Sequence, residues 1–450
     1  SYDWCGTISL QGVILNAARE VTEIKTASGG VVQVRSEKLQ NNVRLLALAD
    51  AFGLKYNYKY ETEEELRTLN YGQLILCVDQ DLDGTGKIAS LVLVWIYKFW
   101  PALFVAGRIG RFMTPLIRVY NGSKLVAEFY YEVDFKLWSE THDTKRYNVK
   151  YYKGLAAHNH TEVAAMFKPE KFARSIYTYR PDDVTARLFE AYFGEEADLR
   201  KQELRTPVKH LSAQLSREMI SSQIIPLGTV QLDIDTKLYK NDAIKRQIPG
   251  AIDGLNPARR KILFGMRKRF AAEGKNVEIM VYQAAGYIAD HCMYHHGDAS
   301  LSGTIIYMAQ PHIGARHFPY IHGIGQFGDR HGEAAGSPRY IRVAYNPLMS
   351  QIFPDEDRWH LEYVYEDGKR AEPKYFVPVL PMTVLESYKI VSEGWNHNSF
   401  AREFAPVVAI VTHYVKTGEF PETATLPVNN RNYKGTVRPY RGGEYSFGAY

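Results

Sequence analysis

The feature that most constrains the fold is a group of alternating aspartates directly after a short apolar run. Residues 74–78 have the length and branched apolar character of a buried strand, and residues 87–99 follow with a helical apolar pattern. Between them stand Asp79, Asp81 and Asp83. The same alternation of apolar runs and helical patterns continues through the first 200 residues and predicts an α/β layer with a largely parallel, Rossmann-like sheet. Carboxylates at the carboxyl end of such a strand converge, so the group is predicted to hold a divalent cation.

Several interpretations of these aspartates compete. An EF-hand loop shares the Asp-x-Asp-x-Asp-Gly spacing, but its bidentate glutamate would fall on Ser90, and the loop follows a strand rather than a helix. A metal-dependent phosphotransferase would use Asp79 as its nucleophile. A magnesium site acting on phosphodiesters would use the carboxylates as ligands. The EF-hand is therefore excluded, while the other two interpretations and simple surface acidity stay open at this point.

Length and composition narrow the class of protein. A chain of 450 residues suggests about three domains of ~150 residues each. Its three cysteines, Cys5, Cys77 and Cys292, give neither a disulfide framework nor a Cys-x-x-Cys zinc site, which favours a reducing intracellular compartment. The longest apolar run, residues 88–97, is too short to span a bilayer, so no membrane partner is expected.

Composition divides the chain into four segments. Residues 1–202 carry the α/β layer, and residues 203–236, which are polar with scattered Pro, Ser and Gln, are predicted to be a linker. Residues 237–348 begin basic and helical. In residues 349–450, Pro and aromatic residues punctuate short apolar runs, which predicts a mixed α/β region. The expected strands of that region include residues 375–377 and 407–411.

The third segment has the character of a nucleic-acid-binding module. Ten Lys or Arg against two Asp give residues 237–269 a net charge of +8, which predicts a phosphate-binding surface, although a solvated basic helix has the same composition. Asn256 is a good N-cap and Pro257 suits the first helical position. Further helical patterns cover residues 283–290 and 300–308. Short helices joined by tight turns predict a helix-turn-helix or winged-helix domain.

One of the 32 tyrosines has a neighbourhood suited to phosphate chemistry. Tyr340 stands beside Arg339 in a Ser-Pro-Arg-Tyr sequence. A phenol, with a pKa near 10, attacks a phosphodiester only where cations lower that pKa and stabilise the developing charge. The other candidate cations are Arg260, Lys261, His295 and His296.

The glycine motifs predict no nucleotide-binding loop. No Gly-x-x-x-x-Gly-Lys-Ser/Thr sequence occurs in the chain. Residues 323–328 match Gly-x-Gly-x-x-Gly, but Asp329 and Arg330 follow where a dinucleotide fold needs an apolar helix. This segment is predicted to be a loop that allows close backbone approach.

Taken in order, these motifs resemble the type IIA DNA topoisomerases, in particular the eukaryotic-like topoisomerase II branch. The likeness extends over nearly all 450 residues, and the collinear order of the motifs makes it specific. The residues similar to the family's Toprim domain are 12–17, 79–84 and 151–155. Those similar to its winged-helix domain are 253–257, 260–264, 294–297, 325–328 and 337–341. Those similar to the start of its tower domain are 372–373 and 377–382.

The resemblance implies a role for each candidate residue. Tyr340 would attack DNA and become linked to a 5′-phosphate, with Arg339 on the scissile phosphate. The implied ligands of Mg²⁺, for which Mn²⁺ or Ca²⁺ can substitute, are Asp79, Asp81 and Asp83. The implied contacts with double-stranded DNA are Lys153, Arg260, Lys261, His295 and His296, with Val391 as an apolar wedge between base pairs. A homodimer with two such tyrosines would cut both strands so that another duplex can pass.

The resemblance also implies that these residues are the breakage-reunion core of a longer enzyme. The family's ATPase domain, an upstream metal-binding glutamate and the coiled-coil exit gate are expected outside residues 1–450, so ATP is expected to serve the full-length enzyme only. Departures from the family, at Thr85 and Gly86, at residues 154–156 and at residues 386–396, suggest a large DNA virus or an early-branching eukaryote. The expected place of action is then the nucleus or a cytoplasmic replication site. A magnesium phosphotransferase centred on Asp79 and a non-catalytic DNA-binding module are the alternatives.

Overall fold

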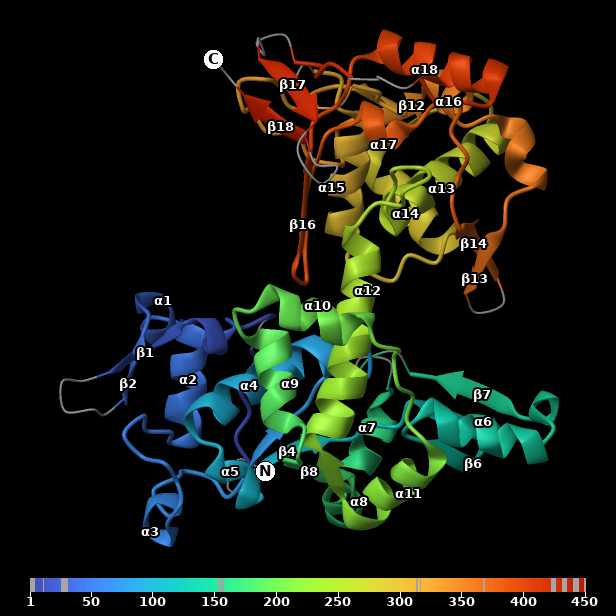
Figure 1. Cartoon of the computed structure of the whole chain (residues 1–450). Coiled ribbons are helices and arrows are strands. Elements are labelled where there is room, and N and C mark those ends of the chain that lie inside the picture. Colours follow the sequence, from blue (N-terminus) through green and yellow to red (C-terminus); the bar gives the residue numbers. More distant parts are fainter. Residues whose placement is uncertain are drawn as a thin grey trace. The chain divides into compact units, whose positions relative to one another are not determined.

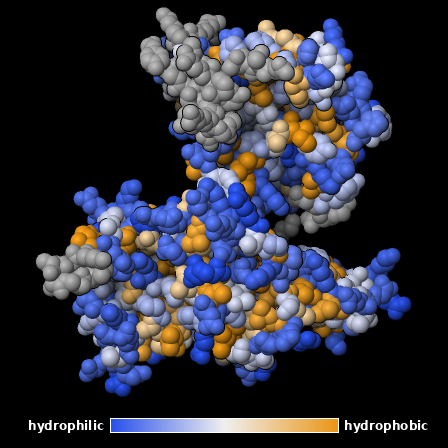
Figure 2. All heavy atoms as spheres, in the orientation of Figure 1, coloured by the Kyte–Doolittle hydropathy of each residue, from blue (hydrophilic) through white to orange (hydrophobic). Residues whose placement is uncertain are grey.

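The computed structural model describes residues 5–10, 12–25, 31–152, 154, 158–312, 315, 317–366, 369–421, 426–430, 435–439 and 445–448. The chain forms two compact units, residues 1–242 (unit 1) and 243–450 (unit 2). Within the described ranges, no helix combines the length and apolar character that a membrane span requires. On the face that Figure 2 shows, hydrophobic residues are scattered among hydrophilic ones.

A four-stranded sheet forms the centre of unit 1 (Figure 1). Its order is β3 (Leu74–Leu76), β4 (Ile109–Phe112), β8 (Ile176–Arg180) and β9 (Ile224–Pro226). The outer pairs β3–β4 and β8–β9 are parallel, but the central pair β4–β8 is antiparallel. Strand β3 confirms the strand expected before the aspartates, and α4 (Ala89–Phe99) confirms the helix expected after them. The sheet is mixed rather than largely parallel, because β4 and β8 are antiparallel.

The segment expected to be a linker is instead part of the folded core of unit 1. It contains α11 (Ala213–Ser222), strand β9 and the π-helix η5 (Leu227–Thr236). Leu227, Leu232 and Gln231 of η5 are fully buried. The expectation for residues 203–236 is corrected, because polar residues of this segment, such as Ser216 and Gln231, are themselves buried and hydrogen-bonded within unit 1.

The remaining elements of unit 1 surround the sheet. The apolar helix α4 (Ala89–Phe99) is buried almost throughout, and a second sheet has the order β6–β5–β7. The other elements are η1 (Ala17–Arg19), β1 (Val21–Lys25), β2 (Val31–Arg35), α1 (Glu37–Gln40), α2 (Val43–Phe52), α3 (Glu63–Leu66), η2 (Asp83–Ile88), α5 (Ala102–Val105), β5 (Ile117–Asn121), β6 (Lys124–Phe129), α6 (Glu132–Thr141), η3 (Thr144–Arg146), β7 (Asn148–Tyr151), α7 (His160–Met166), α8 (Pro169–Ser175), α9 (Thr185–Phe193) and α10 (Ala197–Arg205).

The first half of unit 2 has a winged-helix arrangement. After α12 (Lys237–Gln247), which crosses the boundary between the units, come α13 (Pro257–Glu273), α14 (Val281–His291) and α15 (Asp298–Ala309). An antiparallel sheet follows, with β12 (Arg342–Tyr345) between β10 (Glu278–Met280) and β11 (Ile321–Ile324). The expected helix start is confirmed, since the Asn256 side chain accepts a hydrogen bond from the Arg259 N–H at 3.0 Å.

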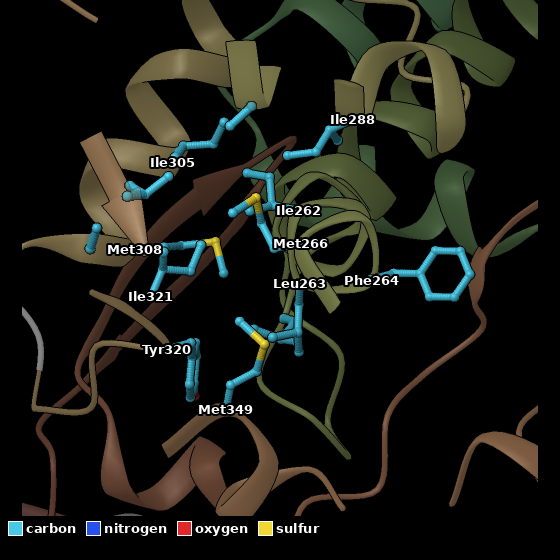
Figure 3. Packing of buried hydrophobic residues seen from close by; sticks show 14 of the residues in the cluster. Ile262, Leu263, Phe264, Met266, Ile288, Ile305, Met308, Tyr320, Ile321 and Met349 are labelled. Carbon is cyan, nitrogen blue, oxygen red and sulfur yellow. The ribbon is translucent and has the colours of Figure 1, made fainter. Parts of the chain in front are cut away.

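The apolar stripe of α13 is the centre of the hydrophobic core of unit 2. Ile262, Leu263 and Met266 are fully buried and point toward side chains from α14, α15 and β11 (Figure 3). Phe264 points away from this group and packs on Tyr363, with ring centroids 5.7 Å apart. This core therefore packs α13, α14 and α15 against the sheet of β10, β11 and β12.

The second half of unit 2 corrects two expected strands. Residues 375–377 form no strand, because the Phe376 N–H donates to the Asp253 carboxylate and not to a neighbouring strand. Residues 407–411 lie in helix α18 (Phe404–Thr417), which ends at Gly418 in the left-handed conformation. The other elements are α16 (Leu348–Ile352), η6 (Asp355–Trp359), β13 (Tyr363–Glu366), β14 (Lys369–Pro373), α17 (Met382–Leu385), β15 (Tyr388–Ser392), β16 (Trp395–Ser399), β17 (Thr436–Pro439) and β18 (Tyr445–Gly448).

Candidate functional site

The aspartate group lies at the carboxyl end of β3, where the chain turns into η2. Asp79 and Asp81 are exposed, and Asp83 is half-buried. The Asp81 carboxylate accepts the Gly84 N–H at 2.6 Å, and the Thr85 hydroxyl donates to the Asp81 carbonyl at 2.9 Å. A Cβ at Gly84 would lie 2.4 Å from the Asp79 carbonyl oxygen, so only glycine permits this turn. The turn thus presents two carboxylates to solvent on a tightly packed support.

The donor chemistry of this edge fits a magnesium ion. Carboxylate oxygens are hard ligands, and Mg²⁺ commonly binds through one or two carboxylates while it keeps several waters. Among the described residues, no three Asp, Glu, His or Cys side chains come together as a ready-made metal cluster. The exposed pair Asp79 and Asp81 is therefore the set that best fits the ion, and the half-buried Asp83 follows at the start of η2.

A loop from the second sheet of unit 1 approaches the same edge. A Cβ at Gly154 would lie 3.1 Å from a carboxylate oxygen of Asp79. Lys153, expected to contact DNA, lies outside the described residues. Before this loop, the Tyr152 phenol donates to Glu162 at 2.6 Å. Although burial favours its protonated form, hydrogen bonds from Tyr152 and the Asn159 N–H lower the pKa of Glu162 to about 2.

Sequence reasoning missed the Tyr152–Glu162 contact. Asn159 and Glu162 form a reciprocal capping box at the start of α7, and the Asn-x-x-Glu spacing that signals it can be found in the sequence. The contact with Tyr152 carries no comparable sequence signal. Together the two interactions hold the chain on both sides of residues 153–157.

The tyrosine singled out from the sequence lies in an exposed turn of unit 2. Tyr340 is 77% exposed, and its N–H donates to the Ser337 carbonyl at 2.8 Å. The flanking backbone is anchored to α14, because the Val281 N–H donates to Ile341 and the Tyr282 N–H to Pro338, both at 3.1 Å. These bonds fix the backbone of the turn and leave the phenol accessible, and Arg339 beside it is also exposed.

Residues 323–328 support this turn. Gly323 and Ile324 end strand β11, so the expected loop is corrected for these two residues, while the expected close backbone approach is confirmed. Gly325 has φ +105°, and a Cβ there would lie 3.3 Å from the Ile341 side chain. A Cβ at Gly323 would lie 2.9 Å from the Ala309 carbonyl oxygen. On the other side, the Gly336 N–H donates to Gln326 at 2.8 Å. The glycines thus serve packing beneath the tyrosine turn and not nucleotide binding.

The histidine pair lies in the turn between α14 and α15. His295 and His296 are both exposed. The His296 ring meets the Tyr294 ring edge-on, with centroids 5.4 Å apart. Their exposure at the end of a winged-helix element leaves them accessible to a ligand, which keeps both as candidate phosphate contacts.

The structure corrects the expectation for Arg260 and Lys261, which are buried in ion pairs of the core. Arg260 donates to the Asp253 carboxylate at 2.7 Å and to the Leu255 carbonyl at 2.8 Å. Lys261 donates to Glu372 at 2.7 Å and to the Cys292 carbonyl at 2.8 Å. Both side chains are below one-tenth exposed. Their charges stabilise unit 2 and are not presented to a phosphate backbone.

Part of the basic segment is paired in the same way. All ten of its Lys and Arg residues are described; Lys245 is exposed, and five others are half-buried. Further pairs join Lys237 to Asp233 in unit 1, and Arg267 to Asp355 and Arg269 to Glu273 in unit 2. Carboxylates therefore offset at least half of the ten charges, and the phosphate-binding surface over residues 237–269 is smaller than the net charge of +8 predicts.

Replacing Lys261 with methionine should destabilise unit 2 by about 3–5 kcal/mol, because the buried Glu372 carboxylate would lose its cation. Urea unfolding followed by Trp and Tyr fluorescence measures this effect. Adding Glu372→Leu should recover most of the lost stability. If Lys261→Met instead has normal stability but binds DNA more weakly, Lys261 is a phosphate contact and not a core ion-pair residue.

Val391 lies on the β15–β16 hairpin, which extends away from the rest of unit 2 (Figure 1). It is 70% exposed, whereas Tyr388 and Ser392 of the same strand are buried. The hairpin turns at Glu393 and Gly394, both with positive φ, as a two-residue turn of this kind requires. The Val391 side chain is therefore not part of a hydrophobic core.

Two protein-family models match the chain. One describes the A subunits of DNA gyrase and topoisomerase IV and matches residues 246–438. The other is described as "C-terminal associated domain of TOPRIM" and matches residues 112–226, which include β9. The two matches fall on the two compact units, with the tyrosine turn inside the first match.

Similar proteins cover the whole chain. DNA topoisomerase 2 of African swine fever virus is 46% identical over 468 residues, which span 100% of this chain and 39% of that protein. DNA topoisomerase 2-alpha of Rattus norvegicus is 30% identical and matches 98% of this chain, but 28% of its own length. The DNA-binding, cleavage and re-ligation domain of Plasmodium falciparum topoisomerase II has a similar fold, with a TM-score of 0.73, 24% identity, and coverage of 97% of this chain and 56% of that one. The chain thus spans less than half of the length of these curated relatives, and it belongs to the type II DNA topoisomerase family.

Proposed function

We propose that this chain makes a transient double-strand break in DNA through a 5′-phosphotyrosine link at Tyr340. The observation that carries the proposal is the exposed phenol on a rigid turn of a winged-helix unit, in a chain of this family. The Tyr340 oxygen attacks the scissile phosphorus, the bond to the 3′-oxygen breaks, and a proton is transferred to that oxygen. Because one phosphodiester replaces another, the reverse attack by the 3′-hydroxyl rejoins the strand without external fuel.

The remaining roles follow from charge and exposure. Arg339 binds the scissile phosphate and stabilises charge that develops during the attack. Asp79 and Asp81 hold Mg²⁺, with Asp83 at the same or a neighbouring ion; when bound, the metal stabilises charge on the reacting phosphate oxygens. His295, His296 and Lys153 contact the DNA backbone. In these assignments, unit 1 provides the metal ligands and unit 2 provides the nucleophile and Arg339.

The relatives extend this proposal to the whole enzyme. Two copies of the chain would provide two tyrosines, one for each strand, so the working form is a homodimer. Passage of a second duplex through the break depends on ATP in the full-length enzyme. Its place of action is where the DNA is replicated, in the nucleus or at a cytoplasmic viral replication site.

Trapping the covalent adduct tests the proposed function. The protein is incubated with Mg²⁺ and a duplex labelled at either the 5′ or the 3′ end of the cleaved strand, and the reaction is stopped with detergent. We expect protein attached to the fragment that carries the new 5′ end, with a bond stable to hydroxylamine. Phosphate on Asp79, which hydroxylamine would release, supports the phosphotransferase instead, and DNA binding without any adduct supports a non-catalytic module.

Val391→Ala should reduce the bending of bound DNA. A branched side chain inserted between base pairs recovers the cost of unstacking through the additional contacts of a bent duplex, and alanine is too short to do so. Energy transfer between dyes at the two ends of a short duplex measures the bend. Because Val391 is exposed, its replacement should change the stability by less than about 0.5 kcal/mol.

The matched control for this prediction is Val415→Ala on α18, where the valine is 77% exposed. It should leave both bending and stability unchanged. Equal bending by wild type and Val391→Ala would remove the wedge assignment.

A further inference from the structure

Between the two exposed aspartates stands a residue whose side chain points inward. The Gln80 amide oxygen accepts from Arg111 of β4 at 2.8 Å. Its amide nitrogen donates to the Thr114 hydroxyl at 3.2 Å. Gln80 therefore uses both ends of its amide to bind the neighbouring strand and the residues after it.

Arg111 is itself held by a carboxylate from a distant part of unit 1. It is 3% exposed, and its guanidinium lies 3.2 Å from the Asp235 carboxylate of η5. Burial disfavours the charged guanidinium, yet the neighbouring Tyr179 phenol and Asp235 raise the pKa of Arg111 above its ordinary value. Asp235 thus balances the buried charge at one terminal nitrogen of the guanidinium, and the neutral Gln80 amide accepts from the other.

The other end of the aspartate turn is tied to the same part of the fold. The fully buried Gln231 of η5 donates to the Thr85 carbonyl at 2.7 Å and accepts from Tyr179 at 3.0 Å. The Thr85 hydroxyl in turn donates to the Asp81 carbonyl. One buried polar network therefore fixes the aspartate turn on both sides of Asp81.

We propose that Arg111 is a positioning residue that acts through Gln80 to direct the Asp79 and Asp81 carboxylates toward one ion. The chain bends at Gln80 and Asp81, and Gln80 is half-buried while its neighbours Asp79 and Asp81 are exposed. By holding the Gln80 side chain inward, Arg111 and Thr114 therefore fix the bend from which both carboxylates reach solvent. This inference rests on the proposed metal site and adds to it two residues, Arg111 and Gln80, that do not bind the ion themselves.

This support stabilises ion binding because the carboxylates are already ordered before the ion binds. Two exposed carboxylates close together repel each other, and a flexible turn would let them separate. Partners of this kind behind a ligand set commonly change metal affinity by 10–100-fold when they are removed. Loss of the Gln80 contacts should therefore weaken ion binding while the aspartates themselves remain.

Direct binding of Mn²⁺ to the DNA-free protein tests the proposal. Free Mn²⁺ is measured by electron paramagnetic resonance during titration of wild type, Gln80→Ala, Arg111→Met and the double variant. We expect each single variant to raise the dissociation constant about 10-fold or more. The double variant should be no weaker than either single one, because both changes break the same connection.

Arg108→Met is the matched control. Arg108 precedes β4 and donates to the Gly72 carbonyl at 3.0 Å, away from the Gln80 amide. It should bind Mn²⁺ as wild type does. An effect of Arg108→Met equal to that of Arg111→Met would overturn the proposal, because the loss would then be general and not routed through Gln80.

The remaining outcomes separate this inference from the function on which it rests. If Arg111→Met does not fold, Gln80→Ala still tests the positioning role, because it removes the Arg111–Gln80 contact at the half-buried Gln80 and leaves the buried Arg111 in place. Wild-type affinity in Gln80→Ala overturns the positioning role alone. No Mn²⁺ binding by wild type, or equal binding by Asp81→Asn, overturns both the metal site and the inference.

Discussion

Tyr340→Phe is expected to abolish the covalent DNA adduct, with a loss of at least ~10³-fold, because the change removes the nucleophilic oxygen and nothing else. The side chain is 77% exposed and its turn is held by backbone hydrogen bonds, so the fold should be unaffected. Adduct yield is measured after a detergent stop, and DNA affinity by a gel-shift or anisotropy titration. Affinity should remain within a few-fold of wild type.

A nearby tyrosine provides the control for this experiment. Tyr282 lies in the first turn of α14, is 48% exposed, and its N–H donates to the carbonyl of Pro338 in the same turn as Tyr340. Tyr282→Phe should cleave as wild type does. A normal adduct in Tyr340→Phe would assign the attack to another residue and would refute the proposed function.

Asp81→Asn is expected to lower the rate of cleavage by about 10²-fold or more, because a metal ion contributes several kcal/mol of charge stabilisation that the neutral amide can no longer attract. Asparagine keeps an acceptor for the Gly84 N–H, which bonds Asp81 at 2.6 Å, so the turn should persist. Single-turnover cleavage as a function of Mg²⁺ concentration measures the effect. DNA affinity measured without Mg²⁺ should not fall, since removing a negative charge cannot weaken attraction to phosphates.

Asp81→Ala extends this test, because it also removes the acceptor and should additionally cost about 0.5–2 kcal/mol of stability. Cleavage is expected to be abolished in this variant. Asp134→Asn serves as the control, because Asp134 lies on α6 and bonds Ser216 within unit 1. Cleavage by Asp81→Asn at the wild-type rate would remove Asp81 from the metal site.

Much of the fold could be predicted because its signals are local. The strand before Asp79 and the helix capped by Asn256 each depend on residues close together in the chain. The antiparallel pairing of β4 with β8 could not be predicted, since it joins residues more than 60 positions apart. Branched apolar residues misled the prediction for α18, because short runs of them suit a strand and a buried helix equally.

For the candidate site, the sequence predicts which acids and which tyrosine to consider, but it does not predict how the neighbouring cations are paired. Asp79, Asp81 and Tyr340 are exposed, as their proposed chemistry needs. The sequence does not reveal that Lys261 is paired, because its partner Glu372 lies 111 positions away and no sequence pattern connects them. The basic segment shows the same limit, since charge counted along a sequence contains no information on which charges are paired in space.

The position of β9 also has a consequence for how the protein folds during synthesis. The strand is contributed by residues near 225, yet it completes the sheet that starts at β3. Until those residues leave the ribosome, β8 is an edge strand whose backbone N–H and C=O groups are open to pairing with another chain. A truncated chain that ends at residue 202 would keep that edge open permanently, and aggregation is the expected result. The first unit can therefore be produced alone only if it extends through η5, to Thr236 or beyond.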